Sequence, residues 1–149
     1  DETSRFHFGS LIRCTVERWD NKSVAWKGSG GGMLDKFIAT DFGRDVTKNC
    51  VSQYLGELPS KTKLVLMFGL GTKLGYLREA RKLFESARPG NWEKINDVSY
   101  SDGNITVVHL EHFASQGALL PNWLGSNDHP RKELGQQARF AVNHSLSAA

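Results

Sequence analysis

Residues 63–75 of this chain read KLVLMFGLGTKLG, and this stretch decides the fold class. The uninterrupted apolar run in residues 64–68 is typical of a strand in a parallel sheet that is covered on both faces. Gly69 and Gly71 end the strand. Apolar residues recur at helical spacing in residues 74–86, which predicts an amphipathic helix. A buried strand, a glycine-rich turn and a helix in this order indicate an α/β fold.

The segments on either side extend this pattern. An apolar i, i+4 stripe in residues 45–58 predicts a helix before the strand, and residues 131–143 predict a final helix. Residues 98–100 and 105–110, with a Ser-Asp-Gly-Asn turn between them, predict a pair of strands. Residues 6–19 indicate extended structure. We therefore expect one domain over the whole chain, with a three-layer α/β/α architecture and a mostly parallel four-stranded sheet.

Composition bounds the class of protein. The chain has 149 residues, of which 39% are hydrophobic and 10% aromatic, so it can bury a core. No apolar run reaches the roughly 18 residues of a membrane-spanning helix, and no signal peptide is evident at the amino end. Two cysteines are too few for a secreted disulfide scaffold. These features predict a cytoplasmic protein that does not span a membrane.

Positive charge is concentrated in one window of the chain. Residues 61–88 contain seven lysines and arginines and two glutamates, a local charge of +5 within a total of +3. Such a window can attract nucleic acid or phosphate, or it can be the solvated face of a helix. Within it, the glycine turn at residues 69–75 lies where backbone amides can hold an anion. It matches neither the Walker nor the dinucleotide-binding pattern, so a plain strand-to-helix turn is the alternative.

Two histidines and a glutamate lie at the end of the second strand of this predicted pair, residues 105–110. In open parallel sheets, ligands bind at the carboxyl ends of strands, which makes these side chains candidates for function. Alternation places His109 and Glu111 on one side of the strand and His112 where the loop begins. Two histidines alone do not make a zinc site, because no third ligand has supportive spacing. A structural role for these histidines is the alternative.

Four segments, in this order, resemble the later two thirds of the uracil-DNA glycosylase superfamily, and most closely its iron–sulfur and single-strand-selective branches. Residues 8–14 (FGSLIRC) resemble the strand that carries the base-reading residue. Residues 49–55 (NCVSQYL) and 64–69 (LVLMFG) resemble the cysteine helix and the apolar strand that follows it. Residues 107–115 (VVHLEHFAS) resemble the strand that leads into the histidine loop.

The resemblance implies an enzyme that flips a damaged base such as uracil out of the DNA stack and hydrolyses its N-glycosidic bond. By position, His112 would donate a hydrogen bond to the base carbonyl as negative charge builds there, and Ser10 would contact the base. The implied partner is DNA, single-stranded or with a flipped base. The residues implied to contact DNA, with a leucine as wedge and two cations at phosphates, are Ser115, Gln116, Leu119, Leu120, Lys73 and Arg131.

The chain departs from the family's pattern, which leaves its enzymatic activity open. Ser10 stands where the family has Asn, and Phe113-Ala114 replaces the proline of the histidine loop. The family's water-positioning loop precedes the matched region and has no counterpart here, so we expect the chain to lack an amino-terminal βα portion. Cys14 and Cys50 match two ligands of the iron–sulfur branch, so a cluster would need two further cysteines from upstream.

Three functions are therefore considered. The first is a DNA-repair-type glycosylase. The second is a non-catalytic nucleic-acid-binding module that kept the fold but lost the water-activating loop. The third is a different small-molecule α/β enzyme that holds an anion at the Gly69 turn.

Overall fold

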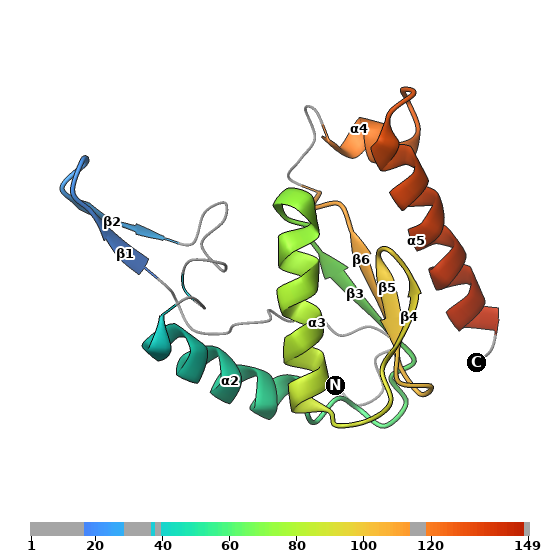
Figure 1. Cartoon of the computed structure of the whole chain (residues 1–149), viewed down its shortest axis with the longest axis horizontal. Helices are drawn as coiled ribbons and strands as arrows, with labels where there is room; N and C mark the ends of the chain where they lie inside the picture. Colours follow the sequence, from blue (N-terminus) through green and yellow to red (C-terminus); the bar gives the residue numbers. More distant parts are fainter. Residues whose placement is uncertain (1–16, 29–36, 38–39, 114–118, 148–149) are drawn as a thin grey trace. The chain divides into compact units, whose positions relative to one another are not determined.

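The computed structural model describes residues 17–28, 37, 40–113 and 119–147 (Figure 1). The chain divides into two compact units, Asp1–Glu57 and Leu58–Ala149. Within the described ranges, no helix is long and apolar enough to cross a membrane.

The first unit contains an antiparallel hairpin and a helix. Strand β1 (Glu17–Asp20) pairs with β2 (Ala25–Gly28), and the register places Trp19 opposite Trp26. The turn between the strands contains Asn21 and Lys22.

Helix α2 (Asp41–Leu55) begins four residues before the helix predicted at residues 45–58. Thr40 caps it, because the Thr40 Oγ1 accepts a hydrogen bond from the Gly43 N–H at 3.0 Å. Apolar periodicity carries no information about such a cap, which explains the earlier start. Thr47 and Cys50 are buried on this helix, so Cys50 has the packing role expected of a cysteine on an apolar stripe.

The second unit contains the strand, turn and helix predicted around residues 63–75. In chain order its elements are β3 (Leu64–Phe68), the 3-10 helix η1 (Thr72–Leu74), α3 (Gly75–Ala87), β4 (Glu93–Asn96), β5 (Ser99–Ser101), β6 (Thr106–Leu110), α4 (Leu119–Leu124) and α5 (Pro130–Ser147). The α/β class is confirmed. Strand β4 and helix α4 were not predicted.

The four strands of this unit form a mixed sheet in the order β3-β6-β5-β4. Strands β3 and β6 are parallel, whereas β5 is antiparallel to both of its neighbours. The prediction of a mostly parallel sheet is therefore wrong. Two residues connect β4 to β5, and four connect β5 to β6. Connections this short join antiparallel neighbours, because a parallel pair requires a crossover of about a dozen residues or more.

Helices α3 and α5 pack on opposite faces of the sheet (Figure 1). Side chains alternate along β6, so His109 faces one side and Val108 the other. Tyr76 of α3 contacts His109, with ring centroids 6.1 Å apart, whereas Ala138 of α5 packs in one cluster with Val108. The sheet thus lies between the two helices.

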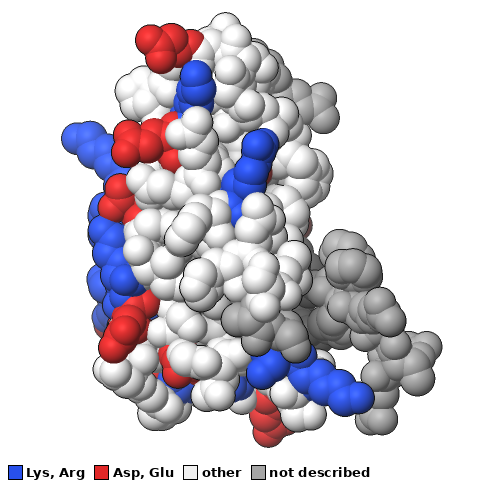
Figure 2. Space-filling view, turned by 90° about the vertical axis from the view of Figure 1, so that its right-hand side faces the viewer, with Lys and Arg blue, Asp and Glu red and all other residues white. Residues whose placement is uncertain are grey.

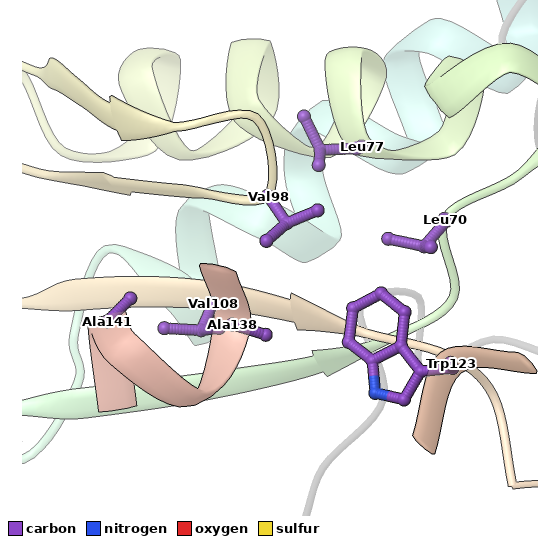
Figure 3. Packing of buried hydrophobic residues seen from close by; sticks show 7 residues of the cluster. All are labelled: Leu70, Leu77, Val98, Val108, Trp123, Ala138 and Ala141. Carbon is purple, nitrogen blue, oxygen red and sulfur yellow. The ribbon is translucent and has the colours of Figure 1, made fainter. Parts of the chain in front are cut away.

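The core of the second unit brings together the sheet, both helices and the glycine turn (Figure 3). Its buried cluster consists of Leu70, Leu77, Val98, Val108, Trp123, Ala138 and Ala141. A second group of rings packs between α3 and the sheet, with Phe84, Trp92 and Tyr100 in mutual contact at centroid distances of 5.6 to 6.1 Å. These contacts bury the apolar face of α3, as its periodicity predicts.

Helix α4 packs against the core of the second unit. Its Trp123 is buried in the core, and Leu120 packs against the same cluster. Gly135 of α5 lies directly against α4, because a Cβ added there would come within 2.2 Å of the Trp123 carbonyl oxygen. The glycine therefore permits the close approach of the two helices.

Strand β3 is an edge of the sheet in the described part of the chain, and only one of its faces is well covered. Met67 is buried, but Leu66 and Phe68 on the other face are exposed. The prediction that this apolar strand is covered on both faces is therefore wrong. An apolar run of this length does not distinguish a central parallel strand from an edge strand.

Candidate functional site

The candidate site lies where the parallel strands β3 and β6 end together. Phe68 and Leu110, the last residues of the two strands, are paired in register. The Gly69 N–H donates a hydrogen bond to the Leu110 carbonyl at 2.8 Å, which extends the pairing into the turn. The residues that follow each strand therefore meet at one edge of the sheet, where open α/β proteins bind ligands.

Three aromatic rings are in continuous contact at this edge. His112 stacks on Phe113 with ring centroids 4.4 Å apart, and Phe113 meets Phe68 edge to face at 5.8 Å. Phe113 is 61% exposed and Phe68 is 43% exposed. We call these three rings the aromatic platform. Exposed aromatic faces of this kind stack on unpaired bases in proteins that bind single strands.

An ion pair joins the end of β6, next to the platform in the chain, to helix α5. Arg131, in the first turn of α5, donates from Nη1 to the Oε2 of Glu111, and Glu111 is buried at the end of β6. The other carboxylate oxygen, Oε1, accepts a hydrogen bond from the His112 N–H at 3.3 Å. The carboxylate of Glu111 therefore joins α5 to the strand end and holds the backbone of His112. The predicted phosphate contact of Arg131 stays a prediction, and its charge is balanced by Glu111.

His109 of β6 is fully buried, and both of its ring nitrogens have partners within the protein. Its Nδ1 lies 3.3 Å from the Gly69 carbonyl oxygen, which can only accept, so Nδ1 donates. Its Nε2 then accepts from the Tyr100 hydroxyl at 3.2 Å. Burial lowers the pKa of His109 to about 4, with the Gly69 hydrogen bond opposing the shift. Burial also raises the pKa of Tyr100. His109 is thus a neutral side chain that ties β6 to the glycine turn.

The glycine turn has a shape that only glycine permits at Gly71. Gly71 has φ +72°, and a Cβ there would come within 2.6 Å of the Tyr76 nitrogen. Lys73 and Leu74 also adopt positive φ, at 49° and 60°. The turn places Leu70 in the core and leaves Lys73 exposed. The anion-binding interpretation of this turn stays a prediction.

The basic window is only partly neutralised in the structure. Arg81 pairs with Glu85 at 2.7 Å, Lys82 with Glu79 at 2.9 Å, and Arg88 with Asp102 at 3.9 Å. No ion pair of the remaining four cations occurs in the described part of the chain; these are Lys61, Lys63, Lys73 and Arg78. On the face in Figure 2, basic and acidic side chains are mixed along one margin and the centre is mostly uncharged. Two of these four cations, Lys73 and Arg78, lie in the turn after β3 and at the start of α3.

Several predicted site residues lie outside the described residues: Ser10, Cys14, Ser115 and Gln116. Of the two predicted wedge residues, Leu119 is half-buried at the start of α4 and Leu120 packs against the core. His112 and Arg131 both contact Glu111 at the end of β6, and Lys73 lies in the turn that follows β3.

An iron–sulfur cluster does not fit the residues present. A four-thiolate cluster needs four cysteines, whereas the chain has two, and Cys50 is buried on α2. Among the described residues, no group of three or more histidine, cysteine, aspartate or glutamate side chains is placed to hold a metal ion.

The sequence did not predict the aromatic platform or the ion pair between Arg131 and Glu111. Phe113 entered only as a departure from a family pattern, and Phe68 only as the end of an apolar run. The available signal was positional, because each phenylalanine lies within three residues of the end of a strand and parallel strands end at one edge. The partner of Glu111 comes from α5, at a sequence separation that no local pattern reveals.

Comparisons with known proteins add no relative: no protein-family model matches the chain, and no curated protein or solved structure matches it.

Proposed function

We propose that this protein binds single-stranded nucleic acid at the carboxyl ends of β3 and β6, where the aromatic platform stacks on an unpaired base. The observation that carries the proposal is the continuous contact of His112, Phe113 and Phe68, with the two phenylalanines exposed. Maintaining large apolar rings in water is unfavourable, so a cluster of them indicates a binding surface. A stacked base would cover the exposed ring faces.

Charge near the platform supports nucleic acid as the ligand. Lys73 is exposed in the turn that follows β3, and Arg78 lies one turn into α3, where its Nη1 donates to the Lys73 carbonyl at 2.7 Å. Both cations are available to phosphate oxygens, because neither has an ion-pair partner among the described residues. Phosphate contacts would position a strand, and the platform would hold one of its bases.

A glycosylase is the second candidate, and the position of His112 favours it. This half-buried side chain lies at the end of β6, stacked against Phe113, where it could donate a hydrogen bond to a base carbonyl. In that reaction the C1′–N bond breaks, the water oxygen bonds to C1′ and a proton goes to the base. The nearby Glu111 is engaged by Arg131 and by the His112 N–H, so it is a poor candidate for activating the water. We therefore rank binding before hydrolysis.

Fluorescence anisotropy with a labelled oligo-dT strand tests the binding proposal. Phe113→Ala should weaken binding at least fivefold, since a base–aromatic stack contributes about 1–3 kcal/mol. Phe140→Ala is the matched control, because Phe140 is equally exposed, at 61%, on the outer side of α5. Binding that is unaffected by Phe113→Ala, or equally weakened by Phe140→Ala, would exclude the platform as the binding site.

A uracil-release assay on single-stranded DNA separates the two candidates. Release that is lost in His112→Ala would establish the glycosylase. Tight binding by the wild-type protein without release would establish the binding module. Release that His112→Ala leaves unchanged would remove the catalytic role of this histidine.

A further inference from the structure

The hairpin of the first unit carries two exposed tryptophans that the proposed site does not use. Trp19 and Trp26 face each other across the strands β1 and β2, and their rings meet edge to face at 5.6 Å with an interplanar angle of 73°. Trp19 is 47% exposed and Trp26 is 64% exposed. Tryptophan is highly buried on average in folded proteins, so an exposed pair indicates a contact surface.

The turn of the hairpin holds this pair in place. One carboxylate oxygen of Asp20 accepts hydrogen bonds from the N–H groups of Lys22 at 2.8 Å and Ser23 at 3.4 Å. These bonds fix the connection between the strands and therefore the register that sets Trp19 opposite Trp26. Because the rings are already positioned, little conformational entropy is lost when they engage a ligand.

The surroundings of the pair favour nucleic acid over an apolar partner. The sequence of residues 17–28 has three basic and two acidic residues, a net charge of +1. The tip residues Asn21, Lys22 and Ser23 are exposed and polar. A membrane or a deep apolar groove would have to desolvate these groups, whereas a base stacked on a ring leaves them in water beside the phosphates.

We propose that Trp19 and Trp26 form a second base-stacking contact, which takes an unpaired base of single-stranded nucleic acid. An edge-to-face pair leaves ring faces that the partner ring does not cover, and every base has a π-face that can stack there. The inference rests on the proposed function for the class of ligand, but it concerns a different unit of the chain and a different set of residues.

Intrinsic fluorescence tests this contact directly. The chain has four tryptophans, and the other two, Trp92 and Trp123, pack against rings or in the core of the second unit. Titration with oligo-dT should quench the wild-type emission, and the quenching should disappear in a Trp19→Phe, Trp26→Phe variant. Trp26→Ala should weaken binding about fivefold or more, while Trp26→Phe should retain most of the affinity because it keeps a ring.

The outcomes separate this inference from the proposed function. Quenching in Phe113→Ala supports the hairpin contact independently of the platform. The hairpin contact alone would be overturned by three results together. Phe113→Ala weakens oligo-dT binding, oligo-dT does not change the tryptophan emission of the wild-type protein, and Trp26→Ala binds oligo-dT as tightly as the wild-type protein does. A blue shift with anionic lipid vesicles, without quenching by oligo-dT, would overturn it in favour of a membrane contact. Absence of any oligo-dT binding would overturn both.

Discussion

Arg131 and Glu111, which are twenty residues apart, form a partly buried ion pair that joins the start of α5 to the end of β6. The carboxylate of Glu111 also accepts a hydrogen bond from the His112 N–H. One carboxylate therefore couples a packing contact between two elements to the backbone of a candidate functional residue.

Removal of one partner of the pair should be strongly destabilising. Arg131→Ala leaves the carboxylate of Glu111 buried without its cation, and breaking a buried pair costs about 3–5 kcal/mol. We expect a loss of about 3 kcal/mol in the free energy of unfolding, measured by urea denaturation. Lys82→Ala is the control, because Lys82 pairs with Glu79 at the surface and should lose less than about 1 kcal/mol. Equal losses in the two variants would show that the Glu111 pair is not buried in solution.

His109 should make the protein less stable as the pH falls from about 6.5 towards 4. Its pKa is lowered to about 4 in the folded protein, whereas an unfolded histidine titrates near 6.5. Between these values the unfolded chain binds the extra proton, so stability is complete above pH 6.5 and is lost on acidification. The expected loss between pH 7.5 and pH 5 is about 2 kcal/mol.

Urea denaturation at the two pH values checks this prediction. The pH-dependent loss should shrink in His109→Gln, even though that variant is less stable at both pH values. His144→Gln is the control, since His144 is exposed on α5 and its replacement should leave the slope intact. A slope that survives in His109→Gln would assign the acid sensitivity to other groups.

Gly71 should tolerate alanine far less well than Gly103. Both have positive φ, at 72° and 87°, so alanine costs about 1–2 kcal/mol of backbone strain at either position. At Gly71 the new Cβ would also collide with the Tyr76 nitrogen, whereas nothing lies within 4 Å at Gly103. We expect Gly71→Ala to cost about 1–3 kcal/mol more, as overpacking does. Thermal denaturation that ranks the two variants equally would contradict the geometry of the turn.

Lys73 should contribute to nucleic-acid binding through charge alone. Lys73→Ala should weaken binding to different single-stranded sequences by a similar factor, and it should reduce the slope of log affinity against log salt by about one. Lys82→Ala is the control within the same basic window, because Lys82 is already paired with Glu79. An unchanged salt slope in Lys73→Ala would place the phosphates elsewhere.

Local patterns in the sequence predicted the elements more reliably than their arrangement. The run at residues 64–68 and the periodicity of residues 74–86 identify β3 and α3, because both signals are local. The same run could not reveal that β3 is an edge strand with Leu66 and Phe68 exposed, since that depends on which strand pairs with it. The short connection between β5 and β6 was visible in the sequence, and its length should have excluded a parallel pairing of these two strands.

The candidate site was predictable only in part. His112 was identified because it follows a strand, but the rings that contact it come from β3 and from the adjacent Phe113. The contact between Phe68 and Phe113 depends on the pairing of two strands that are distant in the sequence. His109 is a candidate by the same sequence pattern, but both of its ring nitrogens are engaged, by Gly69 and Tyr100. Only the structure distinguishes these two histidines.

The parallel pairing of β3 with β6 has a consequence for the order of folding. Strands β4, β5 and β6 form neighbouring antiparallel pairs across short turns, so they can associate early. Strand β3 must close a loop that includes the whole of α3 before Phe68 can meet Phe113, and such non-local closure is slow. We therefore expect the aromatic platform to assemble last and to open first, so that hydrogen exchange at β3 would be faster than at β5 and β6.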